Sequence, residues 1–269
     1  MMDENKLLLA ELTDKYERFL RDSYLIVSDF LNLAQQSAAA GLFRRWRAEG
    51  SKICLFGGYP DAERRMVFFV PDYMPAGDET ELMMYFCENP EECPVVLLDL
   101  KSAGGSNRGG RTLTHRDYLG SLLAEGIRRE KMGDILVRPD GAQVVVTREM
   151  GEYLKLHYSR AGNVPLEVRI LPVSEADTAS VHRETVRFTV ASARLDSVTA
   201  GAFQLSRKDA AEAISRGMVF VDETEILKPD FSLKGGEKLV LRGKGKAIYQ
   251  GVSGTSKKGK LYVTLDRFV

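Results

Sequence analysis

The chain has 269 residues, of which 44% are hydrophobic and 28% are charged, a composition typical of folded globular proteins rather than disordered ones. Its three cysteines and three widely spaced histidines offer little material for a disulfide framework or a metal site. Apolar runs such as residues 95–98 are far shorter than the roughly 20 residues of a membrane span, and residues 1–5 are too acidic and polar for a signal peptide. We therefore expect a cytoplasmic protein with no membrane contact, no metal, no cofactor and no small-molecule substrate.

Charge is unevenly distributed along the chain, although 38 Lys and Arg residues balance 38 Asp and Glu residues overall. From Arg187 to the C-terminus, 15 basic residues against 9 acidic ones give a net charge of +6, which leaves −6 for the rest. A basic module on an acidic body is typical of a protein that binds an anionic partner, and nucleic acid is the most common such partner. The alternative is an ordinary lysine-rich surface without a partner.

Residues 1–92 are predicted to form an α+β region that begins with helices. Leucines and aromatic residues recur every three or four positions in residues 2–39, which predicts helical structure, with a second segment that starts at about Ser23 and ends near Gly41. Two strands, 52–56 and 66–70, are separated by a Gly- and Pro-containing turn, and residues 79–87 are predicted as a further helix. Trp46 lies among arginines that could help it to stack on a base, but such a tryptophan more often packs in a small core.

Residues 93–172 show the order of elements of a ferredoxin-like βαββαβ domain. The predicted strands are 95–100, 134–138, 143–147 and 166–171, and the predicted helices are 114–125 and 148–158. Thr114 and Asp117 are spaced like a capping box at the start of the first helix. The middle strands carry no aromatic RNP1-like motif, so base stacking on this sheet is not expected. The polar segment 173–185 is predicted as a linker.

The C-terminal residues 186–269 are predicted to contain two short helices and a small sheet. The first helix opens at residues 194–196, and the second is capped by Ser206 and ended by Gly217. At 100° per residue, Arg207, Lys208 and Ser215 fall on one flank of the second helix with the small Ala211 between them. This arrangement lets a phosphate approach, and the free N–H groups of the helix start favour an anion at the same place. Residues 242–246 form a cationic loop, and a hairpin ends the chain.

Several spaced motifs in this module match a known domain. Arg-Leu-Asp at 194–196 precedes Ser-Arg-x-x-Ala-x-x-x-Ile-x-x-Gly-x-Val-x-Val at 206–221, and Lys-Pro at 228–229, Gly-Gly-Glu at 235–237 and Arg-Gly-Lys-Gly at 242–245 follow. This pattern resembles the S4 RNA-binding domain, and together with residues 114–135 the chain is similar to the YlmH-like family. The resemblance implies a bacterial ribosome-associated protein that binds structured rRNA or tRNA, handles stalled large subunits, and has a link to cell division.

The predicted fold class is α+β, with a helical N-terminal part, a ferredoxin-like middle domain and a C-terminal S4 domain. We expect the S4 domain to contact RNA through Arg194, Ser206, Arg207, Lys208, Ala211, Ser215, Arg216, Lys228, Arg242, Lys244 and Lys246. A basic loop predicts a possible second RNA contact at Arg128, Arg129 and Lys131. One departure from the S4 pattern is Asp222-Glu223, where the family usually has Asn-Gly; the two acids could weaken or redirect RNA binding.

The competing hypothesis is an RNA-modifying enzyme with an appended S4 domain. Arg194-Leu195-Asp196 also resembles the catalytic box of pseudouridine synthases, in which the aspartate is the nucleophile. Too few residues follow Asp196 for the usual catalytic body, so we interpret it as a helix-start residue that pairs with a neighbouring cation or N–H group. Residues 105–112 nearly spell a P-loop but have arginine in place of the lysine, and His115 has no nucleophile near it. We expect no catalytic residue and no enzymatic activity.

Overall fold

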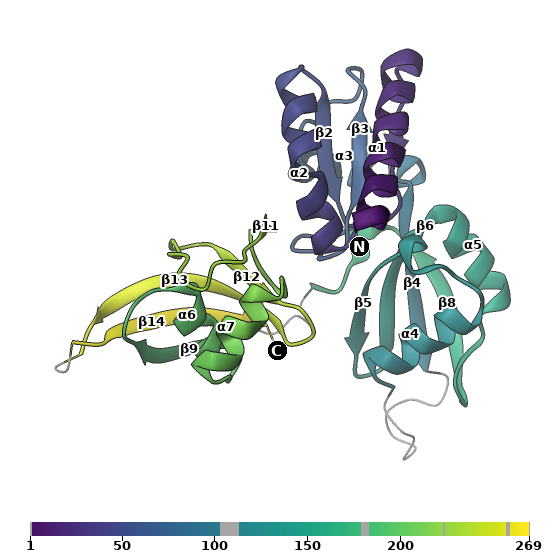
Figure 1. The fold of residues 1–269 in the computed structure, drawn as a ribbon. Helices are drawn as coiled ribbons and strands as arrows, with labels where there is room; N and C mark the ends of the chain where they lie inside the picture. Colours follow the sequence, from purple (N-terminus) through teal and green to yellow (C-terminus); the bar gives the residue numbers. More distant parts are fainter. Residues whose placement is uncertain (1, 103–112, 179–182, 223, 257–258, 269) are drawn as a thin grey trace. The chain divides into compact units, whose positions relative to one another are not determined.

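The computed structural model describes residues 2–102, 113–178, 183–222, 224–256 and 259–268. The chain divides into two compact units, residues 1–180 and 181–269, and each is described by itself below (Figure 1). The structure is mixed α and β in both units, as the sequence predicts. Among the described helices, none combines the length and the apolar character needed to cross a membrane.

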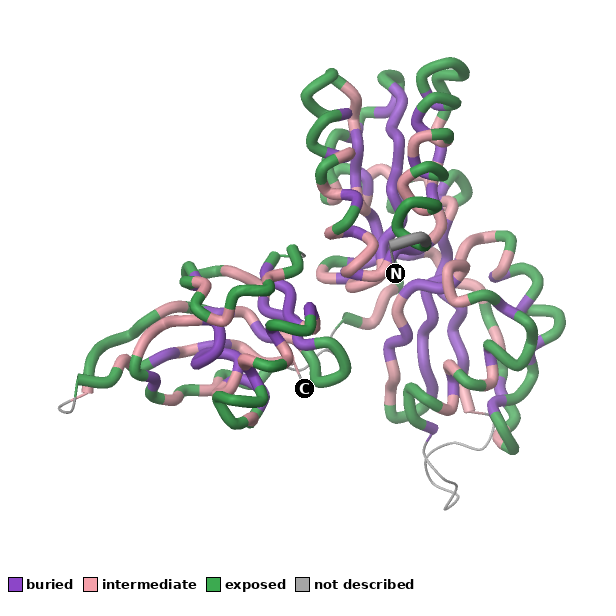
Figure 2. Tube along the Cα trace, in the orientation of Figure 1, coloured by how far each residue is buried: buried purple, intermediate pink, exposed green. Residues whose placement is uncertain are grey.

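The first unit begins with helices packed on both faces of a small antiparallel sheet with the order β1-β3-β2. Its elements are α1 (Met2–Asp22), β1 (Ile26–Val27), α2 (Leu33–Ala48), β2 (Lys52–Phe56), β3 (Met66–Val70), α3 (Glu79–Glu88) and the 3-10 turn η1 (Pro90–Glu92). Every residue of β3 is buried, because α1 and α2 cover one face of the sheet and α3 covers the other (Figure 2). Trp46 is fully buried and stacks on Tyr16 with ring centroids 4.4 Å apart, which confirms its interpretation as a core residue.

The helix boundaries near the N-terminus correct the sequence prediction. The predicted break near Ser23 is present, because α1 ends at Asp22 and Ser23 has a φ of 53°, but β1 follows it in place of a helix. A new helix then starts behind Asn32, whose side chain forms a capping box with Gln35. This helix continues through Gly41, which we predicted as its end, because Gly41 lies on the exposed side and its helical backbone needs no left-handed conformation.

The second part of this unit is a five-stranded antiparallel sheet with the order β5-β6-β4-β8-β7. Its elements are β4 (Val95–Ser102), α4 (His115–Ala124), η2 (Arg129–Lys131), β5 (Met132–Arg138), β6 (Gly141–Thr147), α5 (Arg148–His157), β7 (Arg160–Ala161), β8 (Val164–Leu171) and η3 (Val173–Glu175). The predicted order of four strands and two helices is present, with the short β7 added. Both hydrogen bonds of the predicted capping box between Thr114 and Asp117 are also present.

Both faces of this sheet are covered along its central strands. Helices α4 and α5 pack on one face, where Val96, Leu98 and Val144 are buried. The opposite face of the same strands packs against the N-terminal elements, with Leu97 and Val145 in one core with Phe30 and others. Nucleic-acid bases therefore cannot stack on the centre of this sheet, which agrees with its lack of an RNP1-like motif.

A carboxylate fastens the N-terminal elements to the sheet. Asp134 at the start of β5 accepts hydrogen bonds from the hydroxyl of Tyr59 (2.7 Å) and from the backbone N–H groups of Glu63 (2.6 Å) and Arg64 (3.1 Å). The guanidinium of Arg64 donates in turn to the carbonyl groups of Met132, Phe30 and Arg129. Burial of Arg64 lowers its pKa to about 10, so it stays charged at neutral pH.

Replacing Tyr59 by phenylalanine is expected to lower the free energy of unfolding by about 1.5–3 kcal/mol, the usual contribution of a hydrogen bond to a charged group. The Tyr59 side chain is 3% exposed, so water cannot take the place of its hydroxyl at Asp134. Chemical denaturation of the full chain measures the loss, with Tyr24→Phe at an exposed tyrosine as the control. Equal stability of the two variants would contradict the role given to this junction.

The segment predicted as a linker, 173–185, is shorter in the structure. Val173 is buried in the core, and the side-chain amide of Gln143 bonds both the carbonyl of Glu175 (3.1 Å) and the N–H of Asp177 (2.7 Å). At the other end, Arg183 already belongs to a strand of the second unit. Residues 179–182 of the predicted linker lie outside the described residues.

The second unit is a six-stranded antiparallel sheet with the order β11-β10-β12-β13-β14-β9 and two helices on one face. Its elements are β9 (Arg183–Val190), α6 (Leu195–Ala202), α7 (Arg207–Ser215), β10 (Val219–Val221), β11 (Thr224–Glu225), β12 (Lys238–Leu241), β13 (Gly245–Thr255) and β14 (Leu261–Phe268). Helix α6 packs closely on β9. At Gly201 a Cβ atom would come within 2.1 Å of the Phe188 ring, which shows how close the two elements are. The predicted helix pair and terminal hairpin are present, and β9 is a strand that the sequence prediction missed.

Candidate nucleic-acid interface

A buried carboxylate organises two arginines at the start of α6. Asp196 is 5% exposed and accepts a hydrogen bond from Nε of Arg207 at 2.9 Å, while Nε of Arg194 lies 3.4 Å from its other oxygen. The backbone N–H of Ser197 donates to it as well, at 2.8 Å. Burial raises the pKa of Asp196, but the hydrogen bond and charge of Arg207 and the charge of Arg194 outweigh burial and hold the pKa below its usual 3.8. The carboxylate is therefore ionised, and our interpretation of Asp196 as a helix-start residue paired with neighbouring cations is confirmed.

The start of α7 presents cations to solvent beside this carboxylate. Ser206 caps the helix, and its hydroxyl accepts the N–H of Asp209 at 3.1 Å. Arg207 remains 56% exposed at its side chain despite its ion pair, and Lys208 is exposed. Ala210 and Ile214 face the core, so Lys208 lies on the solvent flank that also carries the small Ala211. This surface, formed by Arg194, Arg207, Lys208 and Ala211, is called the α7 cationic surface below.

Two predicted contact residues lie elsewhere in the unit. Arg216 is on the opposite flank of α7 from Arg207, and its guanidinium is paired with Glu212 at 2.6 Å. Lys246 alternates with Ala247, which faces the helices, so Lys246 lies on the far face of the sheet with its ammonium 4.8 Å from the Phe268 ring centroid. The prediction that Arg216 and Lys246 lie with the other cations was therefore wrong. The periodicity of the helix and of the strand places both side chains outside the α7 cationic surface.

The remaining predicted residues are distributed between two loops and the helix. Lys228 precedes Pro229, whose carbonyl accepts the N–H of Asp196 at 2.9 Å, so this loop borders the α7 cationic surface. Arg242 and Lys244 belong to the β12–β13 turn, which is joined to the segment after α7 by the bond from the Arg242 N–H to the Met218 carbonyl. Ser215 is exposed on α7, and its hydroxyl donates to the carbonyl of Ala211 at 2.9 Å, so its contact with RNA stays a prediction.

The predicted second RNA contact is largely occupied by bonds within the protein. Arg129 donates to the carbonyl groups of Met132 and Gly133, both at 2.9 Å, and burial lowers its pKa. The ammonium of Lys131 is 2.6 Å from a carboxylate oxygen of Asp29. Arg128 alone of the three keeps a mostly exposed side chain, at 70%, so the three residues do not form a common RNA surface.

Other motifs of the sequence have structural positions of their own. Asp222, one of the two acids that replace Asn-Gly, has a φ of 44° and its carboxylate accepts the N–H of Lys238 at 2.8 Å. It thus fills the left-handed turn position that favours asparagine or glycine, and its charge is engaged by the backbone. Glu223 and the near-P-loop 105–112 lie outside the described residues. His115 is the first residue of α4, where burial and the charge of Arg129 lower its pKa.

Comparisons with known proteins show which proteins this chain is similar to. Residues 109–175 match a family model described as "Putative RNA-binding domain in YlmH". The chain is 26% identical over 258 residues to the ribosome-associated protein quality control protein P2 of Bacillus subtilis (strain 168), a match that covers 94% of this chain and 91% of that protein. A solved structure, the cell division protein ylmH from Streptococcus pneumoniae, matches with a TM-score of 0.47 and 20% identity over 64% of this chain and 93% of that one. The family model and the Bacillus relative confirm the predicted resemblance to the YlmH-like family, the first over residues 109–175 and the second over 94% of the chain.

Proposed function

We propose that this chain is a non-enzymatic RNA-binding protein that docks on structured rRNA or tRNA at the large ribosomal subunit. In this proposal residues 183–268 form an S4 domain and residues 95–171 a ferredoxin-like domain. The family-model match to an RNA-binding domain and the ribosome-associated Bacillus relative support the proposal. The proposal includes a role in the handling of stalled large subunits in the cytoplasm, and the Bacillus relative, named as a ribosome-associated quality control protein, supports it.

The observation that carries the proposal is the pair of arginines fixed by the buried Asp196. Because Nε of Arg207 is bound to the carboxylate, its outer Nη groups keep a set direction while more than half of the side chain stays in solvent. An oriented guanidinium can donate two parallel hydrogen bonds to a phosphate, and less conformational entropy is lost when it binds. Lys208 and the first N–H groups of α7 add positive potential beside it.

Affinity and selectivity have different sources in this arrangement. Contacts to phosphates supply affinity without reading the sequence, since every nucleotide carries the same phosphate. The fit of the α6–α7 pair to an RNA groove or junction supplies selectivity by shape. Ala211 contributes by its small size, because it leaves room for the RNA backbone between the flanking cations.

Co-sedimentation of the full chain with purified large ribosomal subunits, measured at a series of salt concentrations, tests the proposal. If Arg194, Arg207 and Lys208 each neutralise one phosphate, the logarithm of the binding constant falls with the logarithm of salt concentration with a slope of at least about 2.7. Subunits carrying a tRNA and subunits without one distinguish tRNA from rRNA as the target. Failure to co-sediment at low salt, or binding that is insensitive to salt, would refute the proposal.

A further inference from the structure

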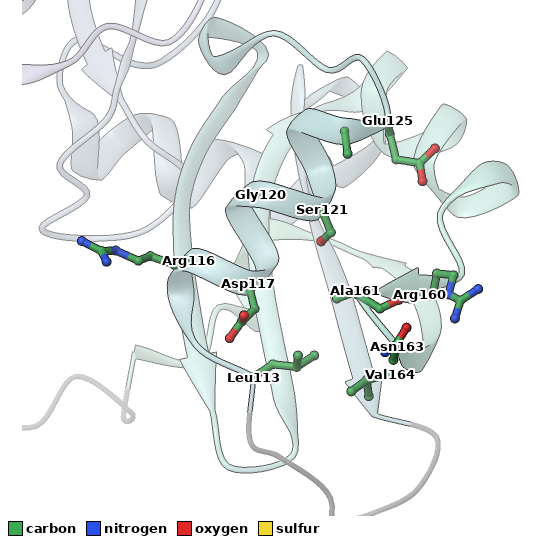
Figure 3. Close-up of a pocket in the computed structure, with 12 residues that line it drawn as sticks. Leu113, Arg116, Asp117, Gly120, Ser121, Glu125, Arg160, Ala161, Asn163 and Val164 are labelled. Carbon is green, nitrogen blue, oxygen red and sulfur yellow. Dashed lines mark hydrogen bonds between the residues drawn. The ribbon is translucent and has the colours of Figure 1, made fainter.

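A pocket of about 810 Å³ lies in the first unit between α4 and the β7–β8 hairpin (Figure 3). Its apolar lining comes from both elements and consists of small or aliphatic residues: Leu113, Gly120, Ala124, Ala161 and Val164. The sequence could not show this pocket, because its two walls are about 40 residues apart along the chain. Its size is within the range of roughly 300–1,000 Å³ that is usual for ligand pockets.

Six polar or charged residues border the apolar lining: Arg116, Asp117, Ser121 and Glu125 on the α4 side, and Arg160 and Asn163 on the hairpin. Asn163 is exposed at the tip of the hairpin, and its side-chain amide offers both a hydrogen-bond donor and an acceptor. The hydroxyl of Ser121 is 2.5 Å from that of the buried Tyr158, which fixes its position on the α4 wall. Arg160 donates from Nε to the carbonyl of Gly162 at 3.0 Å, so its Nη groups point outward from the hairpin (Figure 3). Asp117 is engaged in the capping box.

We propose that this pocket receives one unpaired nucleotide of the bound RNA, with its base on the apolar lining and its phosphate at Arg160. The inference rests on the proposed function and extends it to a second RNA contact in a different unit. The residues that line the pocket all lie within 113–164, inside the segment that matches the RNA-binding family model. A flat base can approach the exposed Gly120 closely because glycine has no side chain, and Asn163 is placed to bond its edge.

The arrangement of the first unit favours this position over the sheet. The central strands are covered on both faces, so the mode in which bases stack on an open sheet is closed to this domain. The side chains of Arg129 and Lys131, which were predicted to contact RNA, bind a backbone carbonyl and a carboxylate of the protein itself. The pocket combines an apolar lining with an exposed arginine and an amide, which are the features that recognise a single base and its phosphate.

Filling the pocket with a leucine at Gly120 tests the inference with little risk to the fold. A Cβ atom at Gly120 meets nothing within 4 Å, and leucine favours a helix more than glycine does. Gly41 is the matched control, since it is also an exposed helical glycine whose Cβ position is open. Both variants are made in the full chain that also carries Arg207→Gln and Lys208→Gln, so that contacts at the α7 cationic surface are reduced.

The probe is single-stranded oligoadenylate or oligouridylate of about ten nucleotides, within the usual site size of single-strand binders. After ultraviolet crosslinking, we expect adducts on peptides 113–125 and 158–164, reduced about tenfold by Gly120→Leu, as for one lost base contact, and unchanged by Gly41→Leu. Equal adduct yields in the two glycine variants, or adducts only outside these peptides, would overturn the pocket assignment. A failure of the proposed function gives a different result. In that case the Arg207→Gln/Lys208→Gln variant binds large subunits as tightly as the unmodified chain does, while the adducts at the pocket persist.

Discussion

Replacing Arg207 and Lys208 together by glutamine is expected to weaken binding of the full chain to large ribosomal subunits about 100-fold near physiological salt. Each side chain makes one charge-assisted contact to a phosphate in our proposal, and each such contact contributes about 1.5 kcal/mol, or roughly tenfold in affinity. The salt dependence should change too, with a slope lower by about 1.8 because two fewer phosphates are neutralised. Titrations at several salt concentrations measure both quantities.

Two control variants show whether position or charge causes the loss. Arg44→Gln with Arg45→Gln removes the same charge from exposed positions on α2, and we expect its affinity to match that of the unmodified chain. Arg216→Gln removes a cation from the opposite flank of α7, where it is paired with Glu212, and we expect a small effect. The result to compare is the loss of affinity per charge removed. If it is the same for Arg207→Gln/Lys208→Gln and for the two controls, net charge explains the affinity and the α7 cationic surface has no special role.

Replacing Asp196 by asparagine is expected to weaken RNA binding about tenfold, although the substitution makes the unit more positive. The reason is that asparagine cannot hold both guanidiniums as an ionised carboxylate does, so Arg207 loses its set direction and must be ordered by the RNA. Loss of the charge-assisted bonds should also lower the free energy of unfolding by about 1–2 kcal/mol. Binding titrations and thermal denaturation of the same preparation separate the two effects.

Asp209→Asn is the matched control for this variant, since it removes one acidic charge from an exposed position in the first turn of α7. We expect its affinity to be unchanged or slightly higher. In a chain that already carries Arg194→Gln and Arg207→Gln, adding Asp196→Asn should have little further effect on binding, because both residues that it positions are gone. A higher affinity for Asp196→Asn than for the unmodified chain would show that its charge, and not its positioning role, matters.

Because Asp196 is ionised, the stability lost in Asp196→Asn is expected to depend on pH. Its pKa is lower in the folded chain than the usual 3.8, so its contribution to stability is present above about pH 4. That contribution is lost as the pH falls through the folded pKa. The stability difference between the unmodified chain and Asp196→Asn should therefore shrink on acidification below pH 4.

The elements that the sequence predicts well are those with strong local signals. Strands β2 and β3 have the predicted bounds, because their apolar runs are separated by a Gly- and Pro-containing turn. Helix α4 begins at its capping box, and α7 is bounded by its Ser206 cap and Gly217. At these places local conformational preference and tertiary packing agree.

The elements that it misses depend on distant partners or on weaker signals. Strand β9 is polar and largely exposed, and its hydrogen-bonding partner β14 is about 75 residues away along the chain. The start of α2 at Leu33, about ten residues later than predicted, did have a signal, since Asn32 and Gln35 have the spacing of a capping box. Gly41 was misleading because an exposed glycine can continue a helix at a modest cost.

The same distinction applies to the candidate site. Arg207, Lys208 and Ala211 were predictable because one helix relates them by a fixed angle. The positions of Arg216 and Lys246 were not predictable in this way. Arg216 lies on the opposite flank of α7 and Lys246 on the far face of the sheet, and these placements depend on what each element packs against. Likewise, only the fold shows that Arg129 and Lys131 are occupied by contacts within the first unit.

Crosslinking the unmodified full chain to large ribosomal subunits and mapping the modified residues by mass spectrometry tests the central claim most directly. We predict RNA adducts in residues 194–211, at the start of α6 and α7, and their loss when Arg207 and Lys208 are replaced by glutamine. Adducts confined to residues 1–178, or to the far sheet face around Lys246, would contradict it.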